Sequence, residues 1–322
     1  MFYTLLNYHS LKNDYLIFRG SERLDLINRL STNKVDKLIS GNGIKTILTN
    51  DKGRIIDLIT LYVFDDFIFS SCSFGNSKNV EAHLDKYIIM DDFKHEDMTG
   101  THETILFFGD KSDKFAEQVF SFDLSKSGNN DFRILKNNGF DIMVSRNDDA
   151  FQGFKAIYPV EAKDYFENNY FIAEIRAKYE LHIVNDNNFN TMRIEHGIPV
   201  FDNELNENTN PLECGLNKYV SFTKGCYIGQ EVIARQDSYD KISKHLVGIK
   251  FDYKFNLDSL LNNHPLIHDN KECGNITSYT QSDRFGKIGL GFVRTQFLDI
   301  NSNYSIRLND TLYNCSINEL PF

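Results

Sequence analysis

Residues 223–235, TKGCYIGQEVIAR, bring together the side chains of this 322-residue chain that are best suited to chemistry. Lys224 lies two residues before Cys226, and Gln230 and Glu231 open an apolar, helix-like run. A nearby cation and a helix N-terminus each lower the pKa of a thiol, so Cys226 is the best placed of the five cysteines to be a thiolate at neutral pH. The alternative is that Cys226 is a small buried apolar residue, because free cysteines are often structural.

Two glycines, Gly225 and Gly229, lie on either side of Cys226. A glycine lets the backbone adopt a positive φ or approach a ligand closely. An ordinary turn is the alternative for Gly229. We therefore expect an irregular loop at Cys226 that leads into a helix beginning near Gln230.

Helix- and strand-like segments alternate through the first half of the chain and must position this loop. Residues 15–18 are typical of a strand, and Ser21 is placed to cap a helix with apolar residues at positions 24, 27 and 30. Asp65-Asp66 and Asn138-Gly139 are typical of hairpin turns. Further helices are expected near residues 77–88, 115–119, 162–170 and 190–195. This alternation predicts α+β lobes built on antiparallel sheets.

The chain changes character after about Ser243. HLVGIKF, GKIGLGFVR and YSIRL are short alternating segments separated by turn residues, a pattern that predicts a small β-barrel or sandwich. We therefore expect two intertwined α+β lobes at residues 1–242 and a C-terminal β-barrel at residues 243–322. Residues 201–211, FDNELNENTNP, are expected to form a polar loop.

The composition limits the classes of function. Acidic residues outnumber basic ones by 45 to 35, a net charge of −10, which argues against binding nucleic acid by phosphate neutralisation. The cysteines are odd in number and lack metal-ligand spacing, which is typical of reduced thiols in the cytoplasm. No apolar run approaches the roughly 20 residues of a membrane span, and no targeting signal is recognised. We expect a cytoplasmic monomer that contacts neither membranes nor nucleic acid.

KGCYIGQE, at residues 224–231, resembles the K-G-C-Y-x-G-Q-E signature of the YgfZ-type folate-binding proteins, a branch of the glycine cleavage T-protein (aminomethyltransferase) superfamily. RIEHGIP, at residues 193–199, is similar to the family's R-x-E-x-G-x-P segment, and PLECGL, at residues 211–216, to its P-x-E-x-G-L segment. The three segments follow the family's order. The likeness covers nearly the whole chain and is weakest between about residues 110 and 190.

The resemblance implies a fold and a ligand. The fold would be a three-lobed ring of two α+β lobes and a C-terminal β-barrel around an opening that binds tetrahydrofolate. In this family the glutamate of R-x-E-x-G contacts the pterin, which carries over to Glu195, because a carboxylate can accept two adjacent N–H donors. The alternative is a surface carboxylate paired with Arg193. Arg193 is expected to orient Glu195 or to join the lobes, and Tyr227 to line the pocket wall.

Two positions depart from the transferases that this chain resembles. In the segment matching GRIIDLITLY, the transferases carry two consecutive acidic residues, of which the second is catalytic, whereas this chain has Asp57 and Leu58. Leucine cannot transfer a proton or stabilise a developing positive charge. We expect Asp57 to be an exposed strand or turn carboxylate. Ser73 takes the place of an asparagine that contacts folate in the transferases.

With these departures, the resemblance predicts a tetrahydrofolate-binding accessory protein that supports assembly or maintenance of iron–sulfur clusters in client enzymes, including tRNA-modifying enzymes. Cys226 would be the reactive thiol, and Lys224 would lower its pKa. One thiol can give one cluster ligand in passage, whereas a stable cluster usually needs four protein ligands. The alternatives are a folate-dependent aminomethyl or one-carbon transferase and a scaffold that has lost folate.

Overall fold

The computed structural model describes residues 6–238, 241–260, 263–308 and 311–322, and the chain divides into two compact units. The first unit comprises the segment up to Leu48, Ile56–Asn185 and Thr223–Ile228. The second comprises Thr49–Ile55, Asp186–Phe222 and Gly229–Phe322. Each unit is therefore assembled from segments far apart in the sequence.

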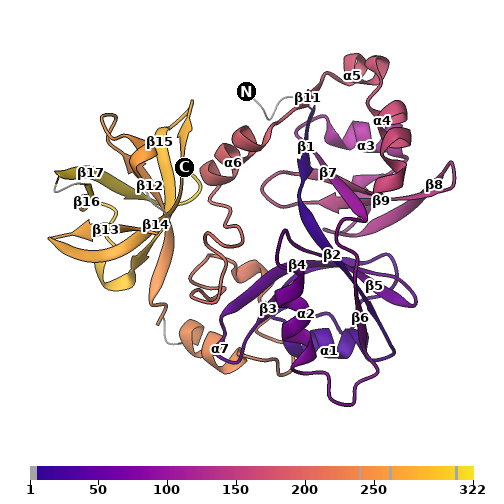
Figure 1. Cartoon of the computed structure of the whole chain (residues 1–322), viewed down its shortest axis with the longest axis horizontal. Helices are drawn as coiled ribbons and strands as arrows, with labels where there is room; N and C mark the ends of the chain where they lie inside the picture. Colours follow the sequence, from indigo (N-terminus) through magenta and orange to yellow (C-terminus); the bar gives the residue numbers. More distant parts are fainter. Residues whose placement is uncertain (1–5, 239–240, 261–262, 309–310) are drawn as a thin grey trace. The chain divides into compact units, whose positions relative to one another are not determined.

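A five-stranded sheet in the first unit carries helices α1 (Arg23–Leu30) and α2 (Ser77–Asp85) (Figure 1). Its strands, in spatial order, are β3 (Gly43–Thr49), β4 (Ile55–Val63), β5 (Phe67–Ser73), β2 (Asn13–Arg19) and β6 (Lys94–Asp97). The two helices bury apolar residues against the sheet in one core, among them Ile27 and Val80. The predicted hairpin turn at Asp65-Asp66 is confirmed, because β4 and β5 pair antiparallel around it.

The beginnings of the two helices differ from the sequence prediction in detail. Ser21 was expected to cap α1, but the cap position is Glu22, and the Ser21 hydroxyl donates instead to the Asp92 carboxylate at 2.7 Å. Asn76 occupies the cap position of α2. Its side chain donates to the Ile56 carbonyl at 3.0 Å, so it joins the helix to β4 rather than capping the helix.

A six-stranded sheet forms the rest of the first unit. Its strands, in order, are β11 (Leu181–Ile183), β1 (Leu6–Leu11), β7 (His102–Phe108), β10 (Gly153–Pro159), β9 (Phe140–Asn147) and β8 (Phe132–Asn137). Only the β1–β11 pair among these is parallel. Helices α3 (Ser112–Phe120), α4 (Lys163–Tyr170) and α5 (Ala173–Tyr179) cover one face through an aromatic core. The Asn138-Gly139 hairpin is confirmed, with φ values of 51° and 83°.

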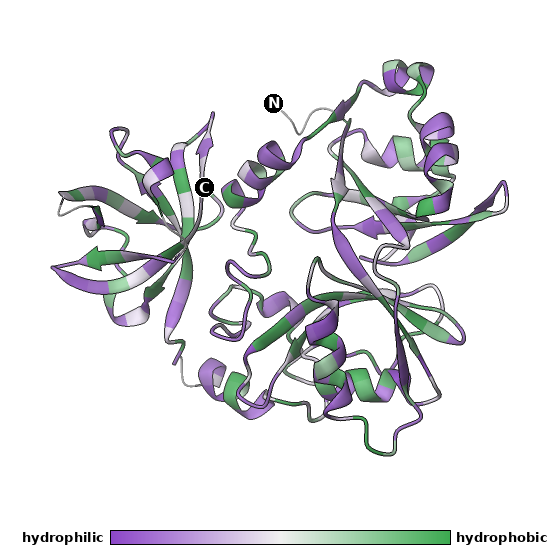
Figure 2. Cartoon of the chain, viewed as in Figure 1, coloured by the Kyte–Doolittle hydropathy of each residue, from purple (hydrophilic) through white to green (hydrophobic). Residues whose placement is uncertain are grey.

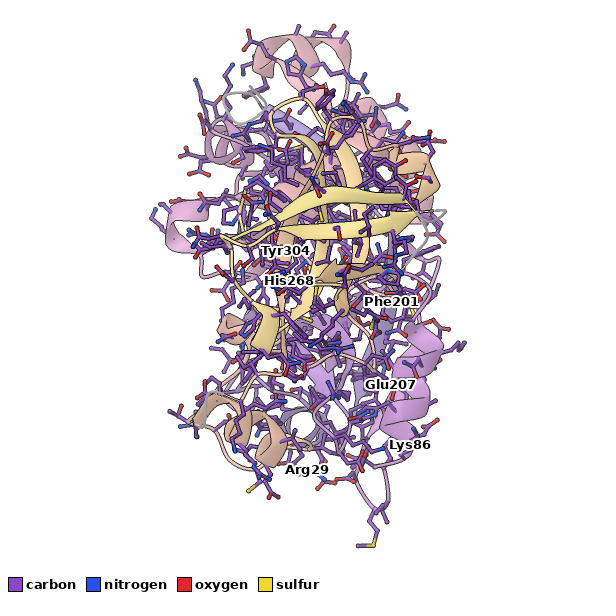
Figure 3. The ribbon with its side chains drawn as sticks, turned by 90° about the vertical axis from the view of Figure 1, so that its left-hand side faces the viewer. Arg29, Lys86, Phe201, Glu207, His268 and Tyr304 are labelled. Carbon is purple, nitrogen blue, oxygen red and sulfur yellow. The ribbon has the colours of Figure 1, made fainter. Side chains whose placement is uncertain are left out.

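The second unit contains a closed six-stranded barrel. Its strands, in order, are β12 (Lys244–Phe251), β15 (Gly286–Arg294), β14 (Lys271–Ser282), β13 (His264–His268), β16 (Tyr304–Leu308) and β17 (Thr311–Asn318). Hydrophilic and hydrophobic residues alternate along these strands (Figure 2), because successive side chains face the interior and the outside in turn. His268 and Tyr304 lie together on the barrel (Figure 3), with ring centroids 4.9 Å apart.

Helices α6 (Asp186–Glu195) and α7 (Gln230–Ser238) complete the second unit. Both begin close to the residues at which the sequence predicted a helix. The predicted barrel is confirmed, whereas the domain boundary at residue 243 stays a prediction. No helix among the described residues is long and apolar enough to cross a bilayer.

Candidate functional site

Cys226 differs from the other cysteines of the chain in being exposed. Cys72, Cys214, Cys273 and Cys315 are buried, and none of the five forms a disulfide. Burial raises the pKa of the Cys214 and Cys315 thiols to about 12, and burial raises the pKa of Cys273 to about 11. The alternative that Cys226 is a buried apolar residue is therefore wrong, and this thiol is the one that solvent and reactants can reach.

The loop around this thiol, residues 224–228, is attached to the C-terminal end of α1, and we call it the cysteine loop. The Lys224 ammonium donates to three backbone carbonyls, those of Asn28 at 2.7 Å, Ser31 at 2.8 Å and Asn33 at 2.6 Å. An ammonium has three N–H donors, so all of them have partners. The last carbonyls of a helix have no partner within it and carry partial negative charge, which is why a buried cation is stable there.

A second hydrogen bond attaches the other end of the cysteine loop to the same helix. The backbone N–H of Ile228 donates to the carbonyl of Arg29 at 2.9 Å. The Ile228 side chain packs against the core under the five-stranded sheet. Cys226 thus lies between two anchored residues, which fixes its backbone while its side chain is exposed.

Burial shifts the titration of two residues in the cysteine loop. It lowers the pKa of Lys224 to about 8, and it raises the pKa of the Tyr227 phenol to about 12. The Lys224 nitrogen lies 5.1 Å from the centre of the Tyr227 ring, within the range of a cation–π contact. The ammonium is directed at carbonyls and at this ring. Its predicted action on the Cys226 thiol stays a prediction.

Gly229 has the positive φ that the sequence suggested, and its close approach is to another part of the chain, whereas the predicted approach to a ligand stays a prediction. Its φ is +78°, and a Cβ there would lie 2.5 Å from the Asn50 carbonyl oxygen and 2.7 Å from the Gly53 Cα. The close approach is to the turn between β3 and β4 within the second unit. Gly225 has open space around it, so its surroundings would accept a side chain.

Glu195, the last residue of α6, is only 7% exposed. One carboxylate oxygen accepts a hydrogen bond from the Ser282 hydroxyl at 2.6 Å, and the other lies 3.6 Å from a guanidinium nitrogen of Arg284. Both partners belong to the end of β14 and the turn that follows it. The alternative of a surface carboxylate paired with Arg193 is therefore wrong.

Arg193 is buried and pairs with a carboxylate that the sequence did not single out. Its guanidinium donates to Glu204 at 3.3 Å, to the Ser278 hydroxyl at 2.7 Å and to the Ile198 carbonyl at 3.2 Å. Burial lowers its pKa from the ordinary value. These bonds join α6 to β14 within the second unit. The expectation that Arg193 orients Glu195 or joins the lobes stays a prediction.

Glu204 is 0% exposed, although it lies in the segment that the sequence indicated to be a polar loop. Its carboxylate also accepts from the hydroxyls of Thr277 and Ser278, both at 2.6 Å, and from the Val200 N–H at 3.0 Å. The polar segment at residues 201–211 therefore includes a buried carboxylate, that of Glu204. No signal in the sequence distinguishes Glu204 from the exposed acidic residues around it.

Asp57 is 0% exposed, so the expectation of an exposed carboxylate is wrong. It accepts from the Leu58 N–H at 2.8 Å, the Ser73 N–H at 2.9 Å and the Ser73 hydroxyl at 2.6 Å. Burial raises its pKa despite these bonds. Ser73, the second departure, is thus a structural partner of Asp57, and both of its donors are used in joining β4 to β5.

Comparisons with known proteins assign the chain to a family. The model of the GCVT N-terminal domain matches residues 13–224, and that of the glycine cleavage T-protein C-terminal barrel domain matches residues 244–322. The chain belongs to the glycine cleavage T-protein family. The predicted superfamily is thereby confirmed, and the finer YgfZ-type assignment stays a prediction.

Relatives of this T-protein family member include enzymes named as transferases. The chain is 25% identical to an aminomethyltransferase of a Thermoanaerobacter species, over 89% of this chain and 78% of the relative. It is 28% identical to an aminomethyltransferase of Leptospira biflexa, over 86% of this chain and 74% of the relative. It is 27% identical to a chloroplastic protein of Arabidopsis thaliana whose name assigns it to the transferases, over 89% of this chain but 65% of that protein.

The T-protein fold is shown by a solved structure as well. The aminomethyltransferase T of the glycine cleavage system from Bartonella henselae matches with a TM-score of 0.82 at 13% identity, over 99% of this chain and 86% of that one. The predicted fold class, α+β with antiparallel sheets and a C-terminal barrel, is confirmed. Among the described residues no group of His, Cys, Asp and Glu could hold a metal ion.

The predicted site residues of this family member form two sets. Lys224, Cys226 and Tyr227 lie in the first unit, on the C-terminal end of α1. Arg193 and Glu195 lie in the second unit, on α6 against β14. Each set is built within its own unit.

Proposed function

We propose that this T-protein family member is a tetrahydrofolate-binding accessory protein of the YgfZ type. It acts in the cytoplasm, where its unpaired cysteines are stable, and supports assembly or maintenance of iron–sulfur clusters in client enzymes, tRNA-modifying enzymes among them. The observation that carries the proposal is the state of Asp57, which is fully buried with hydrogen bonds to both carboxylate oxygens. These bonds to Ser73 and Leu58 support a structural role for Asp57, and Leu58, at the position of the transferases' catalytic carboxylate, cannot transfer a proton.

Glu195 supports the folate part of the proposal. Ser282 and Arg284 fix the direction of the Glu195 carboxylate. An ionised carboxylate can accept about four hydrogen bonds, and Ser282 donates one of them. The remaining positions suit the adjacent N–H donors of a pterin. Arg193 maintains this arrangement through Glu204 and β14. The part of Tyr227 in folate binding stays a prediction.

Cys226 supports the iron–sulfur part. Its thiol is exposed on a loop attached to α1 at both ends, so it can meet a client protein in a defined position. After losing its proton to solvent, the thiolate would replace one thiolate ligand on an iron of a cluster in passage, and the displaced thiolate would take up a proton. The cluster is cargo here, because a stable cluster usually needs four protein ligands.

A calorimetric titration of tetrahydrofolate under reducing conditions tests the folate part. Glu195→Gln keeps the shape of the side chain and removes the charge, and Glu272→Gln is the matched control because Glu272 is exposed on the barrel. We expect binding to wild type, Glu272→Gln and Cys226→Ser, and a loss of at least tenfold in Glu195→Gln. Wild-type protein that does not bind would leave the scaffold alternative.

Recovery of an oxidatively damaged [4Fe–4S] enzyme, with and without this protein, tests the cluster part. We expect Cys226→Ser to abolish the acceleration while tetrahydrofolate still binds. An equal acceleration by Cys226→Ser would show that the thiol has no part in it.

The transferase remains the second candidate function, because the relatives include aminomethyltransferases. It predicts that the purified protein forms methylene-tetrahydrofolate from an aminomethyl donor. If wild-type protein shows this turnover and a variant with Asp57 substituted does not, the protein is a transferase and the proposed accessory role is wrong.

A further inference from the structure

The loop between α2 and β6 exposes two large apolar side chains that are adjacent in the sequence. Ile89 is 84% exposed and Met90 is 93% exposed, the highest values among the large apolar residues in the described part of the chain. Figure 2 shows this loop of the first unit with a hydrophobic tip. We call these two residues the apolar tip. A contiguous exposed apolar surface marks a contact site more often than an isolated exposed residue does.

Ordered residues on both sides hold the apolar tip in place. Before it, the Ile88 N–H donates to the Leu84 carbonyl at 3.2 Å, and the Ile88 side chain packs against the core under the five-stranded sheet. After it, the Asp92 carboxylate accepts from the N–H of Ser21 at 2.8 Å and from its hydroxyl at 2.7 Å. The apolar tip is therefore ordered before any partner arrives, so binding costs little conformational entropy.

The apolar tip and the cysteine loop are attached to the same residue of α1. The Arg29 guanidinium pairs with Asp91, which directly follows Met90. The Arg29 carbonyl accepts from the N–H of Ile228 at 2.9 Å, two residues after Cys226. All of these residues belong to the first unit. The exposed apolar pair and the exposed thiol are thus both held at the C-terminal end of one helix.

The charges around the apolar tip narrow the class of partner. Residues 85–94 contain three aspartates and two lysines, and the neighbouring part of α1 adds Glu22, Asp25 and Arg29. This small acidic excess gives no attraction to the phosphates of nucleic acid or of anionic lipids. A stable dimer buries about 800 Å² per partner, more than two side chains supply, so a second copy of the chain fits less well than a transient protein partner.

We propose that the apolar tip docks a client protein and so brings the client's iron–sulfur cluster within reach of Cys226. The inference rests on the proposed function and names the surface that the client presents, an apolar groove bordered by basic side chains beside its cluster. Ile89 and Met90 would enter the groove and bury their apolar surface there. The acidic residues around the apolar tip would face the basic border, which favours the correct orientation of the client.

Photocrosslinking from the apolar tip identifies the partner. Met90→Cys in a Cys226→Ser background is labelled with a benzophenone maleimide, which reaches the new thiol because the four other cysteines are buried. Tyr253→Cys in the same background is the matched control, at a residue of the second unit that is 77% exposed. Each labelled protein is irradiated in an anaerobic extract of the source organism, and the adducts are identified by mass spectrometry. We expect iron–sulfur enzymes from the Met90→Cys protein and none from the control.

Competition shows whether the apolar side chains themselves make the contact. Excess unlabelled wild-type protein should suppress the crosslinks, and excess Ile89→Ser/Met90→Ser protein should not. Crosslinks to a second copy of this chain, to lipid or to proteins without a cluster overturn the proposal. So does a pattern of crosslinks that is the same in the Met90→Cys protein and the control.

The recovery assay with a damaged [4Fe–4S] enzyme separates docking from cluster chemistry. We expect Ile89→Ser/Met90→Ser to raise the protein concentration that gives half-maximal acceleration at least tenfold, and Tyr253→Ser to leave it unchanged. Cys226→Ser should abolish the acceleration at every concentration. Acceleration that the double variant supports as well as wild type overturns the docking surface and leaves the proposed function intact. Crosslinks to iron–sulfur enzymes without any acceleration by wild type support the docking surface and overturn the cluster role.

Discussion

The cysteine loop and the α6 segment differ in the exposure of the side chain that we propose to meet a ligand. In the cysteine loop the thiol of Cys226 is exposed, and the buried Lys224 and the partly buried Ile228 anchor the loop to α1. In the α6 segment the carboxylate of Glu195 is itself nearly buried, and Arg193 anchors the helix to β14 through Glu204. In each motif a buried cation, Lys224 or Arg193, holds the backbone in place, and charge alone does not identify the residue that meets a ligand.

The largest expected effect comes from the anchor of α6. Arg193→Met leaves Glu204 as a buried carboxylate without its cation, and removal of one partner of a buried ion pair typically costs about 3–5 kcal/mol. We expect urea to unfold the variant at a clearly lower concentration, with Arg294→Met as the control at an exposed arginine of β15. A loss below about 1 kcal/mol would mean that the hydroxyls around Glu204 suffice without the arginine.

Gly229→Ala is expected to have the next largest effect. A positive φ costs a residue with a side chain about 1–2 kcal/mol, and the new Cβ would overlap the turn at Asn50 and Gly53. We expect a loss of about 2 kcal/mol or more in the free energy of unfolding. Gly225→Ala is the matched control in the same motif, because its surroundings are open, and it should change stability by less than about 0.5 kcal/mol. Equal effects of the two would contradict the assignment of backbone roles.

Lys224→Met tests the anchor of the cysteine loop. The variant leaves three carbonyls at the end of α1 without their donor, and we expect a loss of about 1–2 kcal/mol at pH 7. Faster hydrogen exchange at the Ile228 amide, which donates to Arg29, would show that the loop has loosened. Exchange that stays as slow as in wild type would place the anchor at Ile228 alone.

The pH dependence of the same variant has a definite sign. Burial lowers the pKa of Lys224 from 10.5 to about 8, so between these values the unfolded chain binds more protons than the folded one. The free energy of unfolding contributed by this residue therefore rises with pH from about 8 to 10.5. The difference in stability between wild type and Lys224→Met should increase in wild type's favour across this window. A constant difference would show that Lys224 has an ordinary pKa.

The sequence predicts this fold well where local signals and burial agree. The Asn138-Gly139 hairpin, the start of α7 at Gln230 and the barrel strands all follow from turn residues and alternating polarity. It fails for buried charges, because a carboxylate in a polar segment has the same local pattern whether it faces solvent or the interior. Asp57 and Glu204 become interpretable only when their partners, distant in sequence, are brought to them.

The smallest expected effect on stability, and the sharpest test of the comparison, comes from Cys226→Ser. Because the side chain is exposed, the free energy of unfolding should change by less than about 0.5 kcal/mol. Brief treatment of the native protein with a maleimide should modify one thiol in wild type and none in the variant, since the four other cysteines are buried and burial raises the pKa of Cys72, Cys214, Cys273 and Cys315. Intact mass spectrometry counts the adducts. Labelling that persists in the variant would show that the reagent reaches a buried cysteine. It would contradict the claim that Cys226 is the one accessible thiol of the five.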